Sequence, residues 1–388
     1  MQTFVFNEIL NKLIKMSSVE DECVICCDPI GLDKYLFCEN CKNKICKRCY
    51  DLIDYSPKKC PYCTLSLKSS GVWISNCSEY NYYKIQKFTN ETFDSYFESI
   101  KSDADKIIFK NCTFKSNDHH VTTILWNIGK CKFMEFHDCQ IINSANSLLS
   151  YCKHLELVTF SNLSFVNVTD LFNGCERLKE IDLSSMDLSQ FKDFTGIFSS
   201  CESLQTVDLS NTNIQNATNF SYMFALCESL KSVNLSGINV RNLTSCKNMF
   251  SMCTNLKEVN LDNWNTENLS EVRGMFAYCE SLENIHVNHL NVSKVKNLDL
   301  MFFECSSLKE IDISNWNTSN VVSTWRMFEN CKSLKEFDFS KNNFENLNNA
   351  SRMFFNCVNL ELVNMRNINL EKINNIDNML TECNKIIM

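Results

Sequence analysis

The chain has 388 residues, with 38 basic and 46 acidic side chains and a formal net charge of −8. Proteins that bind nucleic-acid backbones do so mainly through Lys and Arg, so this balance argues against general nucleic-acid binding. Only 7 Gly and 3 Pro exclude collagen-like and Pro/Gly-rich disordered chains. No apolar run is long enough to predict a membrane-spanning helix. The unusual feature of the composition is its 24 Cys.

Residues 1–19 carry a short amphipathic pattern. Phe6, Ile9, Leu10 and Leu13 recur at the spacing of one helix face, and polar residues interrupt them. This predicts a short helix that packs against its neighbour, because an export signal requires an unbroken apolar run of at least about 7 residues. We therefore expect the chain in the cytoplasm, where cysteines stay reduced.

Nine Cys are crowded between residues 23 and 63, and eight of them form four C-x-x-C pairs. Each pair can present two thiolates to one ion from a tight turn, and a closed tetrahedral zinc site needs four ligands. Four pairs therefore predict two zinc ions, which would supply the folding energy that so short a segment cannot obtain from a core. Disulfide bonds are the alternative interpretation, and the lack of export features argues against them. The pairs are Cys23/Cys26, Cys38/Cys41, Cys46/Cys49 and Cys60/Cys63.

The spacing of these pairs resembles that of a RING finger in its rarer all-cysteine form, over residues 20–68. Two further hallmarks are Ile25 inside the first pair and Pro61 inside the last. RING sites interleave, so the resemblance implies one zinc ion on the first and third pairs and another on the remaining two. It also implies a ubiquitin ligase without a catalytic side chain, which holds a ubiquitin-conjugating enzyme in a reactive pose. The implied ligands are Cys23, Cys26, Cys46 and Cys49 for the first ion and Cys38, Cys41, Cys60 and Cys63 for the second, and the implied enzyme contacts are Ile25, Tyr50, Leu52 and Pro61.

Two departures from the RING pattern bear on activity. Cys41 and Cys46 stand where most RING fingers have a His, and Thr64 follows the last ligand where many active ligases have an Arg. Weak or absent ligase activity is therefore an open alternative. FYVE-type fingers share the ligand spacing and bind phosphoinositides, but the His-containing run typical of them is missing here. We interpret the basic residues between positions 42 and 48 as a solvated surface.

Beyond the finger, a period of 26 residues governs the chain. Nine Cys from Cys175 to Cys383 follow one another at this interval, within the pattern M-F-x-x-C-x-x-L-K-x-I-D-L-S-x-x-N. Self-similarity at such a period predicts a solenoid of stacked coils. Less regular copies begin at Ile124, so we assign residues 124–388 to the solenoid and residues 69–123 to a linker and an N-terminal cap. The last residues, 386–388, offer no polar cap, so we expect either self-association through the final coil or burial of this coil against a partner.

Each repeat predicts a strand and a helical turn. Leu308, Ile311 and Ile313 are apolar, and polar residues alternate with the last two, which is typical of a short half-buried strand. Stacked coils would then build a parallel sheet. Between Val321 and Cys331 the apolar residues lie three, four and seven positions apart, which predicts a short helix. The expected fold is therefore an α/β repeat solenoid with a parallel β-sheet and short helical segments, preceded by a small two-zinc RING-like domain.

The repeats resemble the 26-residue repeats of bacterial surface proteins, the BspA-like relatives of leucine-rich repeats. The resemblance rests on the M-F-x-x-C-x-x-L core and on an N-W-N-T element at residues 263–266 and 315–318. The bacterial relatives are secreted, but a zinc finger ahead of the array indicates the cytoplasm of a eukaryotic or host cell. The Asn-, Lys- and Ile-rich composition would suit a protist or a large DNA virus.

Two columns of the repeat are interpreted as structural. The repeated Cys lies on an apolar face, and no His or carboxylate repeats beside it, so we expect a buried free thiol rather than a metal ligand. The Asn at the end of the pattern, as at Asn317, is expected to hydrogen-bond the backbone of the turn after each strand.

The outward positions of the strands are the candidate binding surface. They form an acidic stripe with a basic stripe of Lys beside it, and an extended surface of this kind can dock a protein with the opposite arrangement of charge. An equally physical alternative is that alternating charge keeps the sheet soluble and prevents edge pairing. The acidic positions are Glu180, Asp182, Asp208, Glu258, Glu310, Asp312, Glu336 and Asp338.

Two functions remain open. In the first, the chain is a RING-type ubiquitin ligase, whose finger recruits the conjugating enzyme and whose solenoid binds the substrate protein. In the second, it is a non-enzymatic protein-interaction scaffold or a structural component, for example of a viral particle, with a zinc-stapled docking module. Ile25 and Pro61 favour the ligase, and the lack of an Arg after Cys63 favours the scaffold.

Overall fold

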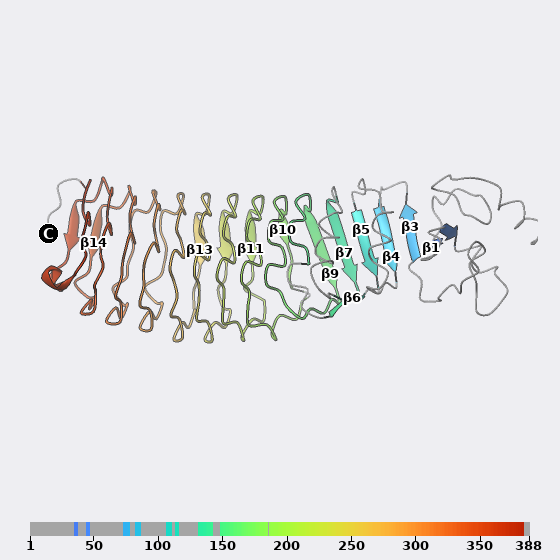
Figure 1. The fold of residues 1–388 in the computed structure, drawn as a ribbon, viewed down its shortest axis with the longest axis horizontal. Coiled ribbons are helices and arrows are strands. Elements are labelled where there is room, and N and C mark those ends of the chain that lie inside the picture. The colour runs from blue at the N-terminus through green and yellow to red at the C-terminus, as the bar shows by residue number, and fades with distance from the viewer. Residues whose placement is uncertain are drawn as a thin grey trace, which may run out of the picture. The chain divides into compact units, whose positions relative to one another are not determined.

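The computed structural model describes short strands before residue 116 and most of the chain after residue 130. The chain divides into two compact units, Met1–Ala145 with Leu157–Val166 and Asn146–Glu156 with Asn167–Met388. Figure 1 draws the chain in order of colour from blue to red. The described residues are 35–37, 44–46, 73–77, 82–86, 106–110, 113–115, 131–142, 148–184 and 186–383.

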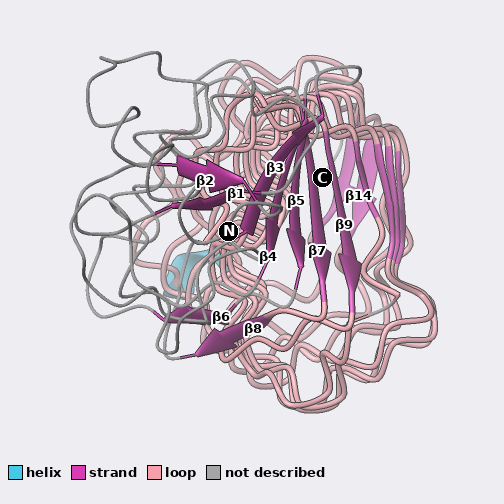
Figure 2. Ribbon diagram, turned by 90° about the vertical axis from the view of Figure 1, so that its right-hand side faces the viewer, coloured by secondary structure: helices cyan, strands magenta, loops and turns pink. Residues whose placement is uncertain are grey.

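The strands of the first unit change from antiparallel to parallel pairing along the chain. They are β1 (Tyr35–Phe37), β2 (Lys44–Cys46), β3 (Trp73–Cys77), β4 (Tyr82–Gln86), β5 (Lys106–Lys110), β6 (Thr113–Lys115), β7 (Phe133–His137), β8 (Gln140–Ile142) and β9 (Leu157–Ser161). β1 pairs antiparallel with β2 and β3, and β3 pairs antiparallel with β4. From β4 onward, β5, β7 and β9 add in parallel, as Figure 2 shows, and β6 and β8 form a separate parallel pair. Parallel stacking therefore begins within residues 69–123, ahead of the copies that the sequence pattern detects.

The parallel part of this sheet already has the internal columns of a solenoid. Along β7, Met134 and Phe136 are buried while their neighbours are more exposed, because successive side chains of a strand point to opposite faces. The ring of Phe136 stacks on that of Phe109 in β5, with the ring centres 4.8 Å apart, and lies 5.8 Å from that of Phe160 in β9. The same aromatic position thus repeats from strand to strand.

The second unit is a stack of coils in which short strands lie side by side in parallel (Figure 1). Its elements are β10 (Glu180–Ile181), β11 (Thr206–Asp208), β12 (Ser232–Asn234), β13 (Glu258–Asn260), β14 (Glu336–Asp338), β15 (Leu362–Asn364) and the 3₁₀ helix η2 (Leu370–Lys372). Residues 26 apart are partners, as in Val207 with Val233 and Val233 with Val259. The predicted parallel solenoid with this period is confirmed. The sheet is interrupted, however, because residues 310–312, whose pattern predicts a strand, form none.

The predicted short helices are wrong. In the described part of the chain the only helix is η2, and the segment around each Met-Phe pair is instead a run of turns. Two residues of each run have left-handed backbone angles, as do Arg326 (φ 56°) and Asn330 (φ 65°). Alternate N–H groups donate to the following coil rather than four residues back, as from Phe302 to the carbonyl oxygen of Met327 at 2.9 Å. The left-handed conformation costs an L residue roughly 1–2 kcal/mol, and the ladder between coils offsets this cost.

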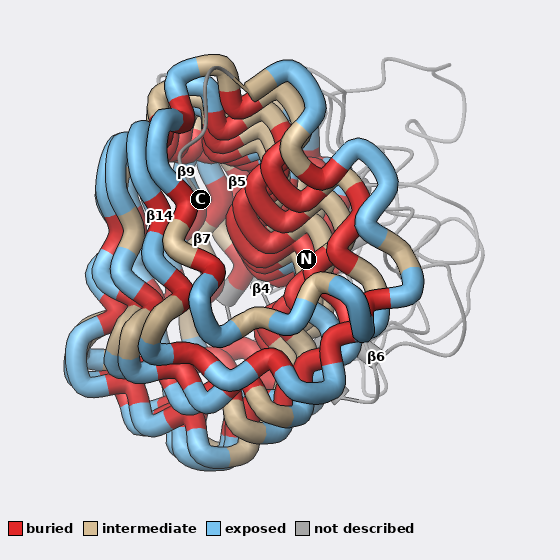
Figure 3. The backbone as a smooth tube through the Cα atoms, turned by 90° about the vertical axis from the view of Figure 1, so that its left-hand side faces the viewer, coloured by how far each residue is buried: buried red, intermediate tan, exposed pale blue. Residues whose placement is uncertain are grey.

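The repeated Phe builds the centre of the core. From Phe172 to Phe354 the rings of this column stack face to face with centres 5.4–5.6 Å apart and planes within 14° of parallel. Each ring is fully buried, and Figure 3 shows buried segments repeated from coil to coil. Offset stacking of this kind adds to the free energy of burying the rings.

The repeated Cys lies buried beside this column, as predicted. The sequence pattern did not predict its hydrogen bond. Cys227 Sγ donates to the carbonyl oxygen of Phe198 in the preceding coil at 3.1 Å, and the same oxygen accepts the N–H of Cys201. A buried carbonyl has two lone pairs to satisfy. The thiol is therefore a small apolar side chain that also provides a second donor for a buried backbone oxygen.

The Asn column forms the predicted turn contacts. Asn317 Oδ1 accepts the N–H of Ser319 at 3.2 Å, and Asn343 Oδ1 accepts the N–H of Glu345 at 3.2 Å. The equivalent bonds form at Asp187, Asn239, Asn265, Asn291 and Asn369.

Candidate functional site

The predicted acidic stripe lies where the strand pattern places it. All eight of its residues are exposed, while Ile181 and Ile311, which lie between two of them, are less exposed and Phe337 is buried. Glu180, Asp208, Glu258, Glu336 and Asp338 lie on strands, and Asp182, Glu310 and Asp312 lie at the equivalent positions of coils that continue the pattern. The stripe therefore lines one face of the solenoid.

The four Asp residues of the stripe have a structural role. Asp338 Oδ1 accepts the N–H of Ser340 at 2.7 Å and so caps the turn that follows the strand. This backbone hydrogen bond, together with one from the Ser340 side chain, lowers the pKa of Asp338. Asp182, Asp208 and Asp312 accept the same bond from the Ser two positions on, at 2.8–2.9 Å. In each of these residues one carboxylate oxygen is therefore already hydrogen-bonded to the following turn and is less available to a partner.

The predicted basic stripe is partly neutralised from within the solenoid. Lys309 Nζ lies 2.5 Å from Glu283 Oε2 in the preceding coil, and Lys179 Nζ lies 2.6 Å from Glu156 Oε2. Exposed pairs of this kind contribute little to stability, but they cancel charge locally. In the described part of the chain, Glu258, Glu310 and Glu336 make no ion pair, so these carboxylates retain their charge on the strand face.

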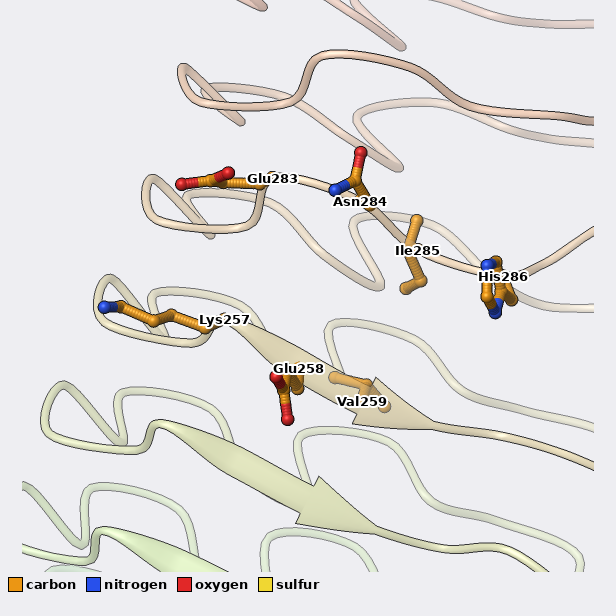
Figure 4. A pocket seen from close by; sticks show the side chains of 7 residues that line it. All are labelled: Lys257, Glu258, Val259, Glu283, Asn284, Ile285 and His286. Carbon is orange, nitrogen blue, oxygen red and sulfur yellow. The ribbon is translucent and has the colours of Figure 1, made fainter.

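The strand ladder is open on one side of β13. Leu235 N donates to the carbonyl oxygen of Asn260 at 3.0 Å, but no backbone hydrogen bond joins residues 257–261 to residues 283–287, both fully described. A cavity of about 480 Å³ occupies this seam (Figure 4). It is lined by Lys257, Glu258, Val259, Glu283, Asn284, Ile285 and His286.

His286, which lines this opening, departs from the residue pattern of its column. Its column holds Asp or Asn in the other described coils from residue 182 to residue 364, and each of those side chains caps the turn after its strand. His286 lacks the side-chain oxygen of this column, and no such bond forms at His286. The ladder also fails beside residues 310–312, whose sequence pattern is regular and where Asp312 caps its turn.

A second opening continues the seam around the coil. Its volume is about 530 Å³, and its lining residues are Asp262, Asn263, Trp264, Asn265 and His289. His289 Nε2 donates to the carbonyl oxygen of Leu261 at 2.9 Å, which bridges the two coils with a side chain where the backbone ladder is missing. The seam is therefore a polar recess with carboxylates, amides and an imidazole at its wall. Among the described residues no group of three or more His, Cys, Asp or Glu is placed to hold a metal ion.

The predicted zinc finger cannot be placed in the same way, because almost all of its named residues lie outside the described residues. Only Cys46, the last residue of β2, is described, by its backbone. The two-zinc domain, the enzyme contacts, the helix over residues 1–19 and the uncapped end at residues 386–388 therefore stay predictions. The residues outside the described ranges are Cys23, Ile25, Cys26, Cys38, Cys41, Cys49, Tyr50, Leu52, Cys60, Pro61 and Cys63.

The fold and its columns define a class of protein, a parallel β-solenoid of the leucine-rich-repeat-like kind. Residues 140–259 and 244–366, which together span more than half of the chain, match the family described as "Mycoplasma protein of unknown function, DUF285". The chain belongs to this family. The match supports the resemblance of the repeats to those of bacterial surface proteins and does not reach the zinc-finger segment. No curated protein matches the chain.

Two solved structures are similar to the chain at low sequence identity. One is a leucine-rich cell surface protein from Faecalibacterium prausnitzii, with 15% identity over 80% of this chain and 93% of that chain and a TM-score of 0.33. The other belongs to the Toll–Spatzle complex of Drosophila, with 14% identity over 77% of this chain and 53% of that chain and a TM-score of 0.24. In the described part of the chain, no helix has the length and apolar character needed to cross a bilayer.

Proposed function

We propose that the chain is a non-enzymatic protein-interaction scaffold and that its solenoid docks a partner protein on the strand face, at the seam beside β13. The observation that carries this proposal is the interruption of the strand ladder between β13 and residues 283–287. Between β11, β12 and β13, by contrast, neighbouring strands pair with each other in register. At the seam a recess of about 480 Å³ is left open, which is large enough to receive side chains of a partner.

The charge of this region indicates the side chains that would enter it. Glu258 and Glu283 line the recess, and Glu310 lies on the same face two coils after Glu258. Only Glu283 is paired, with Lys309. A partner that presents Lys or Arg would meet complementary charge, and such complementarity raises association rates and specificity.

Charge reversal tests the proposal. Proteins captured from the host cytoplasm by the wild-type chain are compared with those captured by Glu258→Lys/Glu310→Lys. The control is Glu345→Lys, an equally exposed carboxylate at the Asn-capped turn, away from the strand face. Loss of a specific partner in the double variant, with retention in the control, supports the proposal. An identical set of captured proteins for all three chains contradicts it.

A ubiquitin ligase is the second candidate. It is proposed from the resemblance of residues 20–68 to a RING finger. Within this segment β1 pairs antiparallel with β2, with Phe37 opposite Lys44 and Tyr35 opposite Cys46. This pairing brings together the two ends of the six-residue segment 38–43, which contains one C-x-x-C pair, as a metal-binding knuckle requires. An autoubiquitination assay with a panel of conjugating enzymes tests this function. Ubiquitin chains that are lost in Ile25→Ala support it, and no chains with the wild type contradict it.

Two zinc ions are proposed separately from ligase activity, because a docking module would need them equally. The donor set of eight thiolates in four C-x-x-C pairs fits two tetrahedral sites. Cys23, Cys26, Cys46 and Cys49 would bind one ion, and Cys38, Cys41, Cys60 and Cys63 the other. Elemental analysis near two zinc per chain is expected, and a value near zero after purification without chelator contradicts the sites.

The cellular compartment and the oligomeric state are further proposals. The described solenoid cysteines are free thiols, which supports a reducing compartment, and we propose the cytoplasm. Imaging of a fluorescent fusion tests this. Self-association through the final coil remains a prediction, and light scattering at increasing protein concentration tests it.

A further inference from the structure

The turn face of the solenoid carries a stripe of large apolar side chains on left-handed backbone. It follows two columns that lie four positions apart in each coil, on the run of turns around the Met-Phe pair. Tyr222, Leu226 and Met252 are 38%, 38% and 40% exposed, so these side chains are partly in solvent. The turn-face stripe consists of Tyr222 (φ 57°), Leu226 (φ 63°), Met252 (φ 64°), Tyr278 (φ 62°) and Leu300 (φ 59°).

The backbone conformation makes these residue choices informative. In the same two columns some coils place residues that adopt left-handed angles readily, such as Gly196 and Asn248, and others place charged residues, such as Glu304 and Arg326. At Gly196 and Gly274 even a Cβ would lie 2.1 Å from a side-chain oxygen of the preceding coil. Gly and Asn adopt left-handed angles at the least cost, so folding alone does not favour Tyr, Leu or Met at these positions. Bulky residues kept in a strained conformation point to a function of their side chains.

The stripe rests on a rigid support. The N–H groups of its residues donate to the carbonyl oxygens of the next coil, from Leu226 to Ser251 at 2.8 Å and from Met252 to Ala277 at 2.8 Å. The Tyr278 ring packs edge-on against Phe303 at 5.0 Å between ring centres. The apolar side chains are therefore presented in a fixed arrangement, which lowers the entropy lost when a partner binds.

Two cations lie in the same turns as residues of the stripe. Lys247 and Arg273 occupy one column in adjacent coils, each one position before the left-handed residue of its turn. Neither makes an ion pair with the described part of the chain, in contrast to Arg326 and Arg352, which both pair with Glu329 further along this face. A ligand of the stripe that carries carboxylates beside its apolar side chains would therefore meet complementary charge, which favours its association.

We propose that the turn-face stripe binds a protein segment in which apolar side chains alternate with Asp or Glu. The apolar side chains pack on Leu226, Met252 and Tyr278, and the carboxylates pair with Lys247 and Arg273. Tyr and Arg are, with Trp, enriched among the residues whose truncation weakens protein interfaces most. This surface differs from the strand face, and the proposal does not depend on the partner proposed there.

A random peptide library displayed on phage and selected against the full chain is the probe. The binding-deficient variant is Leu226→Gly/Met252→Gly/Tyr278→Gly, in which Gly relieves the left-handed strain, so the fold is expected to be retained and circular dichroism checks this. The charge variant is Lys247→Glu/Arg273→Glu. The matched control, Val322→Ala/Leu362→Ala, removes two other exposed apolar side chains.

We expect the enriched peptides to combine Asp or Glu with apolar residues. These peptides should bind the Gly variant and the charge variant about tenfold or more weakly than the wild type. They should bind the control and Glu258→Lys/Glu310→Lys as they bind the wild type. Enrichment of basic peptides, or equal binding to every variant, overturns the proposal. Self-association of the wild type that is lost in the Gly variant also overturns it, because the stripe would then be covered by a second copy of the chain. Retained peptide binding in the strand-face variant distinguishes this test from that of the proposed function.

Discussion

Glu329 and Arg352 form a two-bond ion pair between adjacent coils of the solenoid. Arg352 Nε and Nη2 donate to the two carboxylate oxygens of Glu329 at 2.9 and 2.8 Å, and Arg326 Nε lies 3.2 Å from the same carboxylate. The Glu329 residue is only 3% exposed, whereas the two Arg side chains are about one third exposed. The carboxylate is therefore buried, and within the described part of the chain the cations that pair with it come from its own coil and the next.

Replacing Glu329 by Gln is expected to lower the free energy of unfolding by about 3 kcal/mol, because it leaves two arginines next to a buried site without their counter-charge. Urea unfolding of the wild type and the variant measures this. Glu336→Gln, an exposed carboxylate without an ion pair, is the control and should change the value by less than about 0.5 kcal/mol. Equal effects of the two substitutions would contradict the role of Glu329.

The Phe column gives a second prediction, on packing. Phe276 lies between Phe250 and Phe302, with ring centres 5.4 and 5.5 Å away, and its side chain is fully buried. Phe276→Ala is expected to destabilise the solenoid by about 3–5 kcal/mol through lost burial and the cavity that it leaves. Phe276→Leu should cost much less, since most of the volume is kept. Thermal unfolding of both variants measures the difference, and similar melting temperatures would argue against a packed column.

The stacked architecture could be predicted from the sequence because the period is long, regular and apolar at fixed positions. The helices could not. Met301, Phe302 and Cys305 have the three- and four-residue spacing of a helix face, yet consecutive turns with left-handed residues bury the same positions. Gly274 signals such a turn in its column, but Tyr278 and Glu304, which also have positive φ, do not. Side-chain periodicity reports which residues are buried and not the handedness of the backbone that buries them.

The candidate site shows a similar division. The exposure of Glu258 and Asp338 follows from strand alternation and could be predicted. Asp338 caps a turn and Glu258 does not. This difference could also have been predicted, because a Ser two positions after an Asp is typical of a capped turn. His286 stands out once the repeats are aligned. The open seam itself has no complete signal, because residues 310–312 keep the regular pattern and yet form no strand.

The buried thiols predict a decrease of stability in alkali. Burial raises the pKa of Cys175 and Cys227 to about 12, whereas an unfolded Cys titrates near 8.5. The folded state therefore holds these protons more tightly, so the stabilisation is complete below about pH 8.5 and is lost as the pH rises toward 12. The expected loss is at most about 1.4 kcal/mol per pH unit for each thiol. Urea midpoints at neutral and alkaline pH measure it, and Cys227→Ala should show a smaller decrease than the wild type.

The capped turns predict the opposite dependence in acid. The hydrogen bonds from Ser314 and Ser340 lower the pKa of Asp312 and Asp338. The folded state prefers the ionised carboxylates, so their contribution is present above the unfolded Asp pKa of about 3.9 and is lost as the pH falls through the lower folded values. Asp338→Asn keeps an acceptor without a titrating proton, and its urea midpoint should therefore fall less between neutral and acidic pH. A midpoint that falls as steeply as in the wild type would show that this cap does not control acid stability.

Restoring the missing cap at position 286 should close the seam. In His286→Asn the side-chain oxygen can accept the N–H of Asn288, as Asn260 does with the N–H of Asp262 at 2.9 Å. We expect a gain of about 0.5–1.5 kcal/mol in the free energy of unfolding, the contribution of one hydrogen bond, and slower amide exchange over residues 283–288. His286→Ala removes the imidazole without adding an acceptor and should leave that exchange unchanged.

Two outcomes would contradict the role of the cap. If both variants slow amide exchange equally, the imidazole obstructs the ladder by its size. If neither variant slows it, the seam is set by the neighbouring coil at residues 310–312. Since the docking recess depends on the open ladder, His286→Asn should also weaken capture of the partner that Glu258→Lys/Glu310→Lys loses.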